Sequence, residues 1–466
     1  MAHHSYDLAI LGSGSAAFAA AIAAREQGAR VVMIERGTVG GTCVNIGCVP
    51  SKLLLRAAET FYHASHHPYG GVETRAMGVD LAALVTQKDR LTTAMRREKY
   101  TDLIDEYGWE LVRGEARFVD EATVVVGEQT IRAGAYLVAT GARPAVSAIP
   151  GLEEAGYLTS TTAMEIERLP ASIAIIGAGY IALEQGQIFR HLGSEVTIMQ
   201  RGPRLLPRYE PEVTDAVSQM LARLGTRVLT STHVQRVERT EHGRRLIIWR
   251  DGREETLGAE EILAATGRQP NVEALDLAKA GVELDRRGAP VIDDQLRTTN
   301  PRIFAAGDVT LAPQFVYVAA YEGKLAAANA LNDAGKTLDL TAVPSVIFTE
   351  PQVAAVGLTR AQAEAAGYVV QSATLPVTAV ARAQVNFARE GVFTLVADAA
   401  TGRLLGAQVV AENAGDVIYA ATLAVKYRLT IEDLRESFAP YLTMAEGLKL
   451  GAIAFERDVA KLSCCA

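Results

Sequence analysis

Residues 6–17 read YDLAILGSGSAA, an apolar run that leads directly into a glycine-rich turn. The run predicts a buried β-strand, and the small residues after the turn predict a helix that continues to about Gln27. The turn has the spacing GxGxxA, formed by Gly12, Gly14 and Ala17. Glycines at these positions allow a tight turn and let a pyrophosphate approach the free amides at the helix N-terminus. The stretch therefore predicts the start of an α/β domain that binds a dinucleotide.

A second apolar run over residues 29–34 ends at Glu35 and completes a strand–helix–strand unit. A carboxylate at this point can bind the ribose hydroxyls of an adenine nucleotide. The same pattern recurs with predicted strands at residues 172–176 and 195–199, and GAGYIA places Gly177 and Gly179 directly after the first of these strands. The chain thus contains two copies of a nucleotide-binding unit.

The second copy differs from the first at the end of its second strand. Gln200 stands where Glu35 stands in the first copy, and Arg201 and Arg204 follow it. Guanidinium groups pair with a ribose 2′-phosphate, which a carboxylate repels, so this copy favours NADPH over NADH. A solvated basic loop is the alternative interpretation. Two dinucleotide sites in one chain indicate hydride transfer between a nicotinamide and a flavin, and hence a flavoenzyme.

Composition limits the class of protein. The 466 residues are enough for about three domains, and 49% apolar with 21% charged residues is typical of a globular enzyme. The net charge of −8 argues against nucleic acid as a partner. No apolar run reaches the roughly 20 residues of a membrane span, and residues 8–24 lack the basic start of a signal peptide. These features predict a cytoplasmic protein.

The four cysteines form two pairs. Cys43 and Cys48 lie in GGTCVNIGCVPSK, residues 40–52, whereas Cys464 and Cys465 lie in the terminal KLSCCA. A closed zinc site needs four ligands, and no further Cys or His lies near the first pair in sequence. A helix that begins just after Cys48 would stabilise a thiolate there, which favours nucleophilic chemistry or binding of a soft metal ion.

The segment GGTCVNIGCVPSK resembles the redox-active motif of the FAD-dependent pyridine nucleotide-disulfide oxidoreductases. VATG at 138–141, AATGRQPN at 264–271 and IFAAGD at 303–308 resemble later motifs of that family, so the resemblance covers essentially the whole chain. It implies an α/β fold with two Rossmann-like dinucleotide-binding domains, for FAD and NADPH, and a C-terminal α+β dimerisation domain that builds a homodimer. The implied boundaries are 1–145 and 271–340 for the FAD domain, 146–270 for the NADPH domain and 341–466 for the interface domain.

The resemblance also implies roles for single residues. Cys48 would be the charge-transfer thiolate beside the flavin, and Cys43 the outer thiol that meets the substrate. Lys52 and Glu184 would form an ion pair near the flavin N5, and Tyr180 would cover the nicotinamide pocket, unless it only packs on its helix face. The remaining contacts to the cofactors would come from Gly41, Thr42, Thr140, Gly141, Gly267 and Asp308, in addition to the residues of the two glycine-rich turns.

One position departs from the disulfide-reducing members of the family. These members carry a histidine near the C-terminus, supplied by the partner subunit, as the general acid–base for thiol exchange. Here the matching segment is YLTMAE, with Tyr441 in the histidine's place, and none of the eight histidines lies in the interface domain. A tyrosine with a pKa near 10 is a poor proton shuttle at neutral pH. Reduction of a thiolate-bound soft metal needs no such shuttle.

The terminal pair fits that alternative, because two thiolates at a chain end can capture a soft ion and transfer it by ligand exchange. The combination of features resembles the mercury(II)-reducing members of the family, as a catalytic core without their N-terminal metal-binding domain. This implies that Cys464 and Cys465 take Hg(II) from small thiols and pass it to Cys43 and Cys48 of the other subunit. Reduction to volatile Hg(0) by NADPH and FAD would detoxify mercury. Tyr441 would contact or guard the metal, or would simply pack in the core.

Other functions remain open on the sequence. A large thioredoxin reductase can end in a similar cysteine pair but keeps the histidine, and glutathione and dihydrolipoamide reductases lack the terminal pair. A flavoprotein that sequesters soft metal without turnover would not need the NADPH unit. Finally, His63, His66 and His67 form either an accessory metal site or a solvated helix end.

Overall fold

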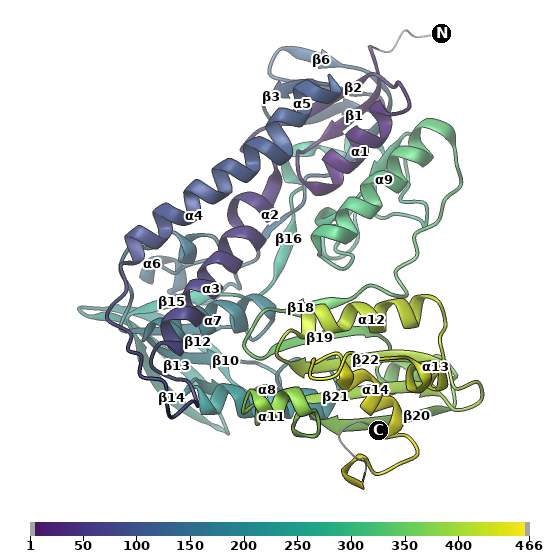
Figure 1. Cartoon of the computed structure of the whole chain (residues 1–466). Helices are drawn as coiled ribbons and strands as arrows, with labels where there is room; N and C mark the ends of the chain where they lie inside the picture. The colour runs from purple at the N-terminus through teal and green to yellow at the C-terminus, as the bar shows by residue number, and fades with distance from the viewer. Residues whose placement is uncertain (1–4, 462–466) are drawn as a thin grey trace. The chain divides into compact units, whose positions relative to one another are not determined.

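In a computed structural model of the chain, residues 5–461 are described (Figure 1). They form two compact units, each built from three separate segments of the chain. The first unit comprises 5–53, 82–145 and 267–339, and the second comprises 54–81, 146–266 and 340–461. This division into two does not decide the boundaries expected at 145, 270 and 340, which stay predictions.

A five-stranded parallel sheet organises the first unit, in the order β17-β7-β1-β2-β3. Its strands are β1 (Tyr6–Leu11), β2 (Val31–Glu35), β3 (Glu110–Arg113), β7 (Ala133–Val138) and β17 (Ile303–Ala305). β1 lies between β2 and β7, with Leu11 opposite both Ile34 and Val138. The chain therefore runs from β1 to β2 on one side and later forms β7 on the other side of β1. A ligand crevice is expected where the strand order switches in this way.

Helices α1 (Ser15–Arg25) and α9 (Val316–Asn332) cover one face of this sheet through a shared apolar cluster. The other elements of the unit include a small antiparallel sheet and a two-stranded link. Their bounds are β4 (Ala116–Asp120), β5 (Thr123–Val126), β6 (Gln129–Ile131), β8 (Ala142–Pro144), β16 (Arg268–Pro270), α2 (Gly41–Ile46) and α5 (Asp102–Tyr107). Two longer helices, α3 (Cys48–His63) and α4 (Leu81–Arg96), continue from this unit into the 54–81 segment.

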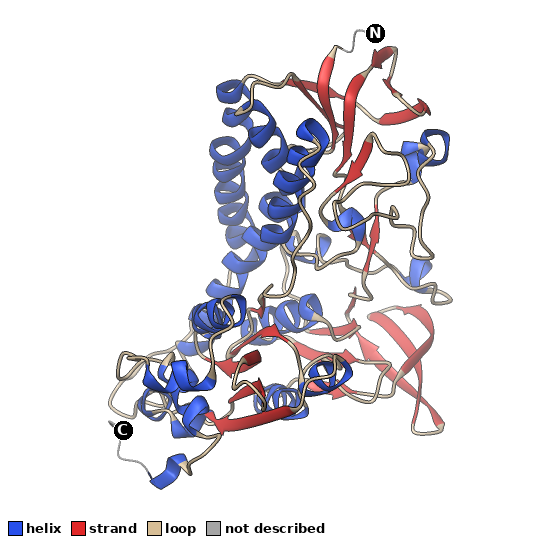
Figure 2. Ribbon diagram, turned by 90° about the vertical axis from the view of Figure 1, so that its right-hand side faces the viewer, coloured by secondary structure: helices blue, strands red, loops and turns tan. Residues whose placement is uncertain are grey.

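The second unit repeats the parallel βαβ arrangement in a four-stranded sheet ordered β11-β10-β9-β15. The elements are β9 (Ser172–Ile176), α7 (Tyr180–Leu192), β10 (Glu195–Met199), α8 (Pro211–Arg223), β11 (Arg227–Leu229) and β15 (Glu261–Ala264). An antiparallel sheet of β12 (His233–Thr240), β13 (Gly243–Arg250) and β14 (Arg253–Ala259) follows β11 in the chain. Figure 2 shows the strands in red and the helices in blue.

The C-terminal part of this unit is a five-stranded antiparallel sheet with helices. Its elements are β18 (Ser345–Ile347), β19 (Gln352–Gly357), α10 (Arg360–Ala365), β20 (Val370–Pro376), α11 (Ala381–Val385), β21 (Val392–Asp398), β22 (Leu404–Ala411), α12 (Ala414–Lys426), α13 (Ile431–Glu436) and α14 (Glu446–Ile453). Every residue of β21 and β22 is buried, because α8 and the C-terminal helices cover the sheet. The predicted fold class, two Rossmann-like domains and an α+β domain, is confirmed. Within residues 5–461, no helix is both long and apolar enough to cross a membrane.

Candidate functional site

The carboxyl ends of β1 and β2 open onto a cavity of about 320 Å³ in the first unit. Five residues predicted to bind the cofactor line it, namely Gly12, Glu35, Gly41, Thr42 and Thr140. The cavity lies at the switch point between β2 and β7, where the topology predicts a ligand. The first turn of α1 has no side-chain cap, so its backbone amides are available to an anion.

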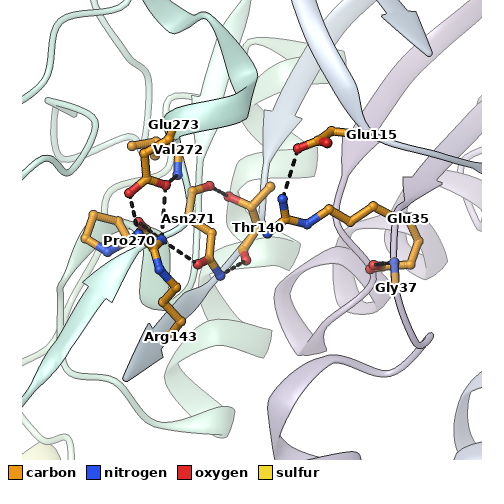
Figure 3. A network of polar contacts seen from close by, with 10 residues as sticks. Glu35, Gly37, Glu115, Thr140, Arg143, Pro270, Asn271, Val272 and Glu273 are labelled. Atoms are coloured by element: carbon orange, nitrogen blue, oxygen red, sulfur yellow. Dashed lines mark hydrogen bonds and ion pairs between the residues drawn. The ribbon is translucent and has the colours of Figure 1, made fainter. Parts of the chain in front are cut away.

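Glu35 occupies the end of β2 and is held in place by the turn it faces. Its Oε2 accepts a hydrogen bond from Ser13 Oγ at 2.6 Å. Its Oε1 accepts one from Gly37 N at 2.6 Å (Figure 3). Beside it, Arg36 pairs with Glu115, another residue of the cavity wall, at 3.0 Å. A fixed carboxylate at this place fits the ribose of an adenine nucleotide.

The two glycine-rich turns have nearly the same geometry. Gly12 has φ +109° and a Cβ on it would lie 2.4 Å from Ala139 O, while Gly177 has φ +107° and its Cβ would lie 2.3 Å from Ala265 O. Gly14 and Gly179, in contrast, have open space where a side chain would be, apart from one atom 3.9 Å from the Gly14 position. The first glycine of each turn is thus required by the fold, and the second leaves room for a ligand. This geometry fits FAD in the first unit and a nicotinamide dinucleotide in the second.

A polar network joins two of the motif segments beside the cavity (Figure 3). Thr140 Oγ1 donates to Asn271 O at 2.7 Å, and Asn271 Nδ2 donates to Thr140 O at 2.9 Å. Arg143 donates to Asn271 Oδ1 at 3.0 Å and pairs with Glu273 through both carboxylate oxygens. The hydrogen bond from Arg143 lowers the pKa of Glu273 to about 2. The network fixes Thr140 and Gly141 against the segment that follows Gly267.

Asp308 lies in the same unit, at the end of the strand β17 segment. Its Oδ2 is 3.6 Å from Arg268 Nη2, and burial raises the pKa of the Asp308 carboxyl. A charged residue in this semi-buried position is suited to bind a polar part of a cofactor.

Cys43 and Cys48 are brought together by two short helical elements. Gly41 and Thr42 line the cavity at the start of α2, Cys43 follows them, and Cys48 begins α3. The Cys43 thiol is hydrogen-bonded to Cys48, and this bond together with burial raises the pKa of Cys43. Cys48 is exposed and Cys43 is partly buried, and neither is in a disulfide. The predicted helix after Cys48 is present, with Cys48 at its positive end.

In the second unit, Tyr180 is the first residue of α7, directly after the glycine-rich turn. Its hydroxyl is 2.5 Å from that of Tyr209, which in turn lies 3.2 Å from Ser345 Oγ. Glu184, one turn along α7, is buried and accepts a hydrogen bond from Phe348 N at 2.9 Å. These bonds hold α7 against the β18 segment.

Gln200, Arg201 and Arg204 lie in the loop after β10, as predicted. Gln200 Nε2 donates to Arg204 O at 3.4 Å, which folds the loop back on itself. Arg201 is exposed and Arg204 is half-buried. Both guanidinium groups follow the strand end at which an adenine ribose would bind.

The other expected site residues are not brought together within one unit. Lys52 belongs to the first unit and Glu184 to the second, so their ion pair stays a prediction. Tyr441 is 49% exposed in the second unit, while Cys464 and Cys465 lie outside the described residues.

The histidine-rich segment forms structural contacts. His63 Nε2 is 2.6 Å from Glu350 Oε1, and His66 stacks on Tyr62. His67 contacts Thr74 at 2.9 Å. Among residues 5–461 no three His, Cys, Asp or Glu side chains are arranged to hold a metal ion.

Sequence reasoning missed two residues near the site. Tyr100 lies in a π-helical turn, Arg97–Thr101. Burial raises the pKa of its hydroxyl, and the negative charge that Cys43 and Cys48 can carry raises it further. The break in α-helical geometry is a signal of functional sites, but it is not visible in sequence. Glu322, in the middle of α9, is fully buried.

Models of protein families match most of the chain. Residues 6–323 match the model described as pyridine nucleotide-disulphide oxidoreductase. Residues 343–452 match the dimerisation domain that goes with it. Together these matches cover both units.

Curated relatives and a solved structure are similar over nearly the full length. The chain is 55% identical to a mercuric reductase of Staphylococcus aureus, over 99% of this chain and 84% of that one. It is 49% identical to a mercuric reductase of Streptomyces lividans, over 100% and 99% of the two chains. The Cu(II) complex of the HOCl-induced flavoprotein disulfide reductase RclA from Escherichia coli has a TM-score of 0.86 at 28% identity, covering 97% of this chain and 99% of that one.

Proposed function

This chain belongs to the pyridine nucleotide-disulphide oxidoreductase family and, within it, to the mercuric reductases, and on that premise we propose that its Cys43–Cys48 dithiol is where Hg(II) is reduced. The enzyme uses FAD and NADPH and converts Hg(II) to Hg(0), which detoxifies mercury. The reaction balances as NADPH plus Hg(II) giving NADP⁺, a proton and Hg(0). The expected family, cofactors and enzyme class are thereby confirmed.

The observation that carries the assignment is the hydrogen bond between Cys43 and Cys48, because Cys43 directly follows Gly41 and Thr42 of the cavity wall. Gly12, Glu35, Thr42, Thr140 and Asp308 would hold FAD. When bound, FAD would supply the two-electron chemistry that links NADPH oxidation to reduction of the metal. Cys48, at the positive end of α3, favours the thiolate form, and Cys43 keeps its proton until a metal ion displaces it. Two thiolates that are close enough to share a hydrogen bond suit a soft ion that prefers two sulfur ligands.

The missing histidine favours metal reduction over disulfide reduction. A leaving thiolate must be protonated, whereas a thiolate-bound metal that gains two electrons needs no proton at the active site. Tyr441 in the histidine's place cannot supply one efficiently at neutral pH. Tyr441 is 49% exposed, and we propose a role for it in metal entry.

The activity is tested with purified protein, Hg(II) and an excess of a small thiol. NADPH oxidation should accompany loss of volatile mercury in equal amounts. Rapid turnover of oxidised thioredoxin or glutathione without a response to Hg(II) would contradict the assignment. Stoichiometric Hg(II) binding without NADPH oxidation would indicate sequestration instead.

NADPH preference is assigned to the loop after β10. We expect Arg201→Glu to weaken NADPH relative to NADH by about tenfold or more, because one lost charge-assisted hydrogen bond costs roughly 1.5–3 kcal/mol. The measurement is the ratio of kcat/KM for the two nucleotides. Arg239→Glu, at an exposed position of β12, is the control and should leave the ratio unchanged. An unaltered ratio in Arg201→Glu would show that the 2′-phosphate binds elsewhere.

The terminal cysteines are assigned to delivery. We expect the double change Cys464→Ala with Cys465→Ala to lower turnover by about tenfold when mercury arrives on a bulky, tightly binding thiol, because a tethered dithiol acts at a high effective concentration. With weakly binding small carriers the loss should be much smaller. Rates are compared across a series of thiol carriers, and equal rates for all of them would refute delivery.

The dimerisation domain fits a homodimer, and we propose that the active site lies between the two subunits. Tyr419 and Tyr427 expose 64% and 67% of their surface on and just after α12, an apolar face that a second copy would cover. With mercury on a bulky thiol, mixing an inactive Cys48 variant with the impaired tail variant should raise the activity per intact Cys43–Cys48 pair above that of the tail variant alone if delivery crosses the interface. The cytoplasmic location remains a prediction, which cell fractionation would check.

A further inference from the structure

Glu322 is a fully buried carboxyl that the reaction as described does not use. Glutamates are almost never buried to this degree without a cation. Its Oε2 accepts a hydrogen bond from Gly307 N at 2.6 Å, whereas its Oε1 has no hydrogen-bond partner among the described residues. A buried polar atom without a partner is destabilising, so this position carries a cost that the fold alone does not explain.

The packing around Glu322 fixes it against the turn that leads to Asp308. A Cβ on the neighbouring Gly323 would lie 2.0 Å from Ala16 O, so α9 and α1 meet backbone to backbone at this point. Gly307 has φ +79°, and a Cβ there would lie 3.2 Å from Ala16 Cβ. The Gly307–Asp308 turn is therefore confined between α1 and α9. The Glu322 carboxylate accepts a hydrogen bond from the backbone amide of Gly307 in this turn.

The electrostatic surroundings of Glu322 do not favour a negative charge. Among residues 5–461, the charge that raises the pKa of Glu322 is that of Asp308. The Asp308 carboxyl is itself 3.6 Å from the guanidinium of Arg268. The faces of α1, β7 and β17 that pack on this part of α9 contribute apolar residues, among them Ala17, Leu137 and Phe304. Burial, with a further contribution from Asp308, raises the pKa of Glu322 to about 7. The carboxyl therefore changes its charge in the neutral range.

We propose that Glu322 is a positioning residue for FAD, which holds the Gly307–Asp308 turn in the shape that contacts the cofactor and couples FAD binding to a proton. The inference rests on the assignment of Asp308 to FAD made above. FAD brings a negatively charged pyrophosphate into this unit, so a neutral Glu322 favours binding and an ionised one opposes it. Because the coupling is reciprocal, FAD is held more tightly at low pH and less tightly as Glu322 ionises.

Two substitutions separate the hydrogen bond from the charge. Glu322→Gln keeps an oxygen that accepts from Gly307 N but cannot ionise, whereas Glu322→Ala removes both. The dissociation constant of FAD is measured on the holoenzyme by flavin fluorescence from about pH 6 to about pH 9. For the wild type it should rise roughly five- to tenfold, at the lower end of typical coupling between sites. Glu322→Gln should stay at the low-pH value throughout, and Glu322→Ala should release FAD at every pH.

Glu59→Gln is the matched control, because burial also raises the pKa of Glu59 but this residue lies in the second unit. It should keep the pH dependence of the wild type. A Glu322→Gln protein with an unchanged pH dependence, or one that loses FAD at every pH, would overturn the inference. A wild-type protein that binds no FAD at any pH would overturn the proposed function instead.

Discussion

We expect Cys48→Ala to lower Hg(II)-dependent NADPH oxidation by about 10³-fold or more, and Cys43→Ala to do nearly the same. Hg(II) held by one thiolate lacks its second soft ligand, and residues that act as a unit lose most of their effect when either is removed. The measurement is steady-state NADPH oxidation with Hg(II) and excess thiol. Serine at either position should fail as alanine does, because a hydroxyl has the shape but not the affinity for a soft metal.

A second measurement shows whether the variants lose only metal reduction or also lose FAD binding and flavin reduction. Both variants should still bind FAD and should still have their flavin bleached by NADPH in a single turnover. In Cys48→Ala, the Cys43 thiol also loses the hydrogen bond that raises its pKa, so Cys43 should react faster with an alkylating reagent at neutral pH. Full activity in either variant would show that the dithiol is not the site of reduction.

The sequence predicted those parts of the structure that depend on local pattern. The strands at Tyr6–Leu11, Ser172–Ile176 and Glu195–Met199 have the predicted bounds, because apolar runs between turns define them. The strand expected from residue 29 begins instead at Val31. Arg30, which the pattern placed inside it, pairs with Asp7 at 3.0 Å, where β1 and β2 begin.

Contacts between distant segments could not be predicted in this way. Asn271 and Thr140 are 131 residues apart, and only the folded chain shows that they exchange two hydrogen bonds. Glu322 stands in the small-residue helix segment VYVAAYEGKLAA, and a glutamate there would ordinarily be assigned to the solvent face. Its burial follows from the close approach of α1 at Gly323, which the sequence of α9 alone does not indicate. The terminal cysteines stay a matter of prediction, since they lie outside the described residues.

The second large effect is expected at Gly12, in the first glycine-rich turn. We expect Gly12→Ala to lower the free energy of unfolding by about 2–5 kcal/mol and to abolish FAD binding, because it combines an overpacked contact with a strained backbone. The new methyl group would lie 2.4 Å from Ala139 O, a backbone atom that cannot move without disturbing β7, at a φ of +109° that alanine rarely adopts. Thermal unfolding and flavin absorbance of the purified protein measure the two effects.

Gly14→Ala is the matched change, two residues further along the same turn. Its methyl group would meet nothing closer than Gly41 Cα at 3.9 Å, and φ is −81°, so stability should stay within about 1 kcal/mol of the wild type. FAD affinity should nevertheless fall, because the methyl group takes the space through which a pyrophosphate approaches the α1 amides. In the second unit, alanine at Gly177 should likewise destabilise the fold, and alanine at Gly179 should mainly weaken NADPH binding. If Gly12→Ala were as stable as Gly14→Ala, the two glycines would not have separate roles, and the assignment of both nucleotide sites would lose its structural basis.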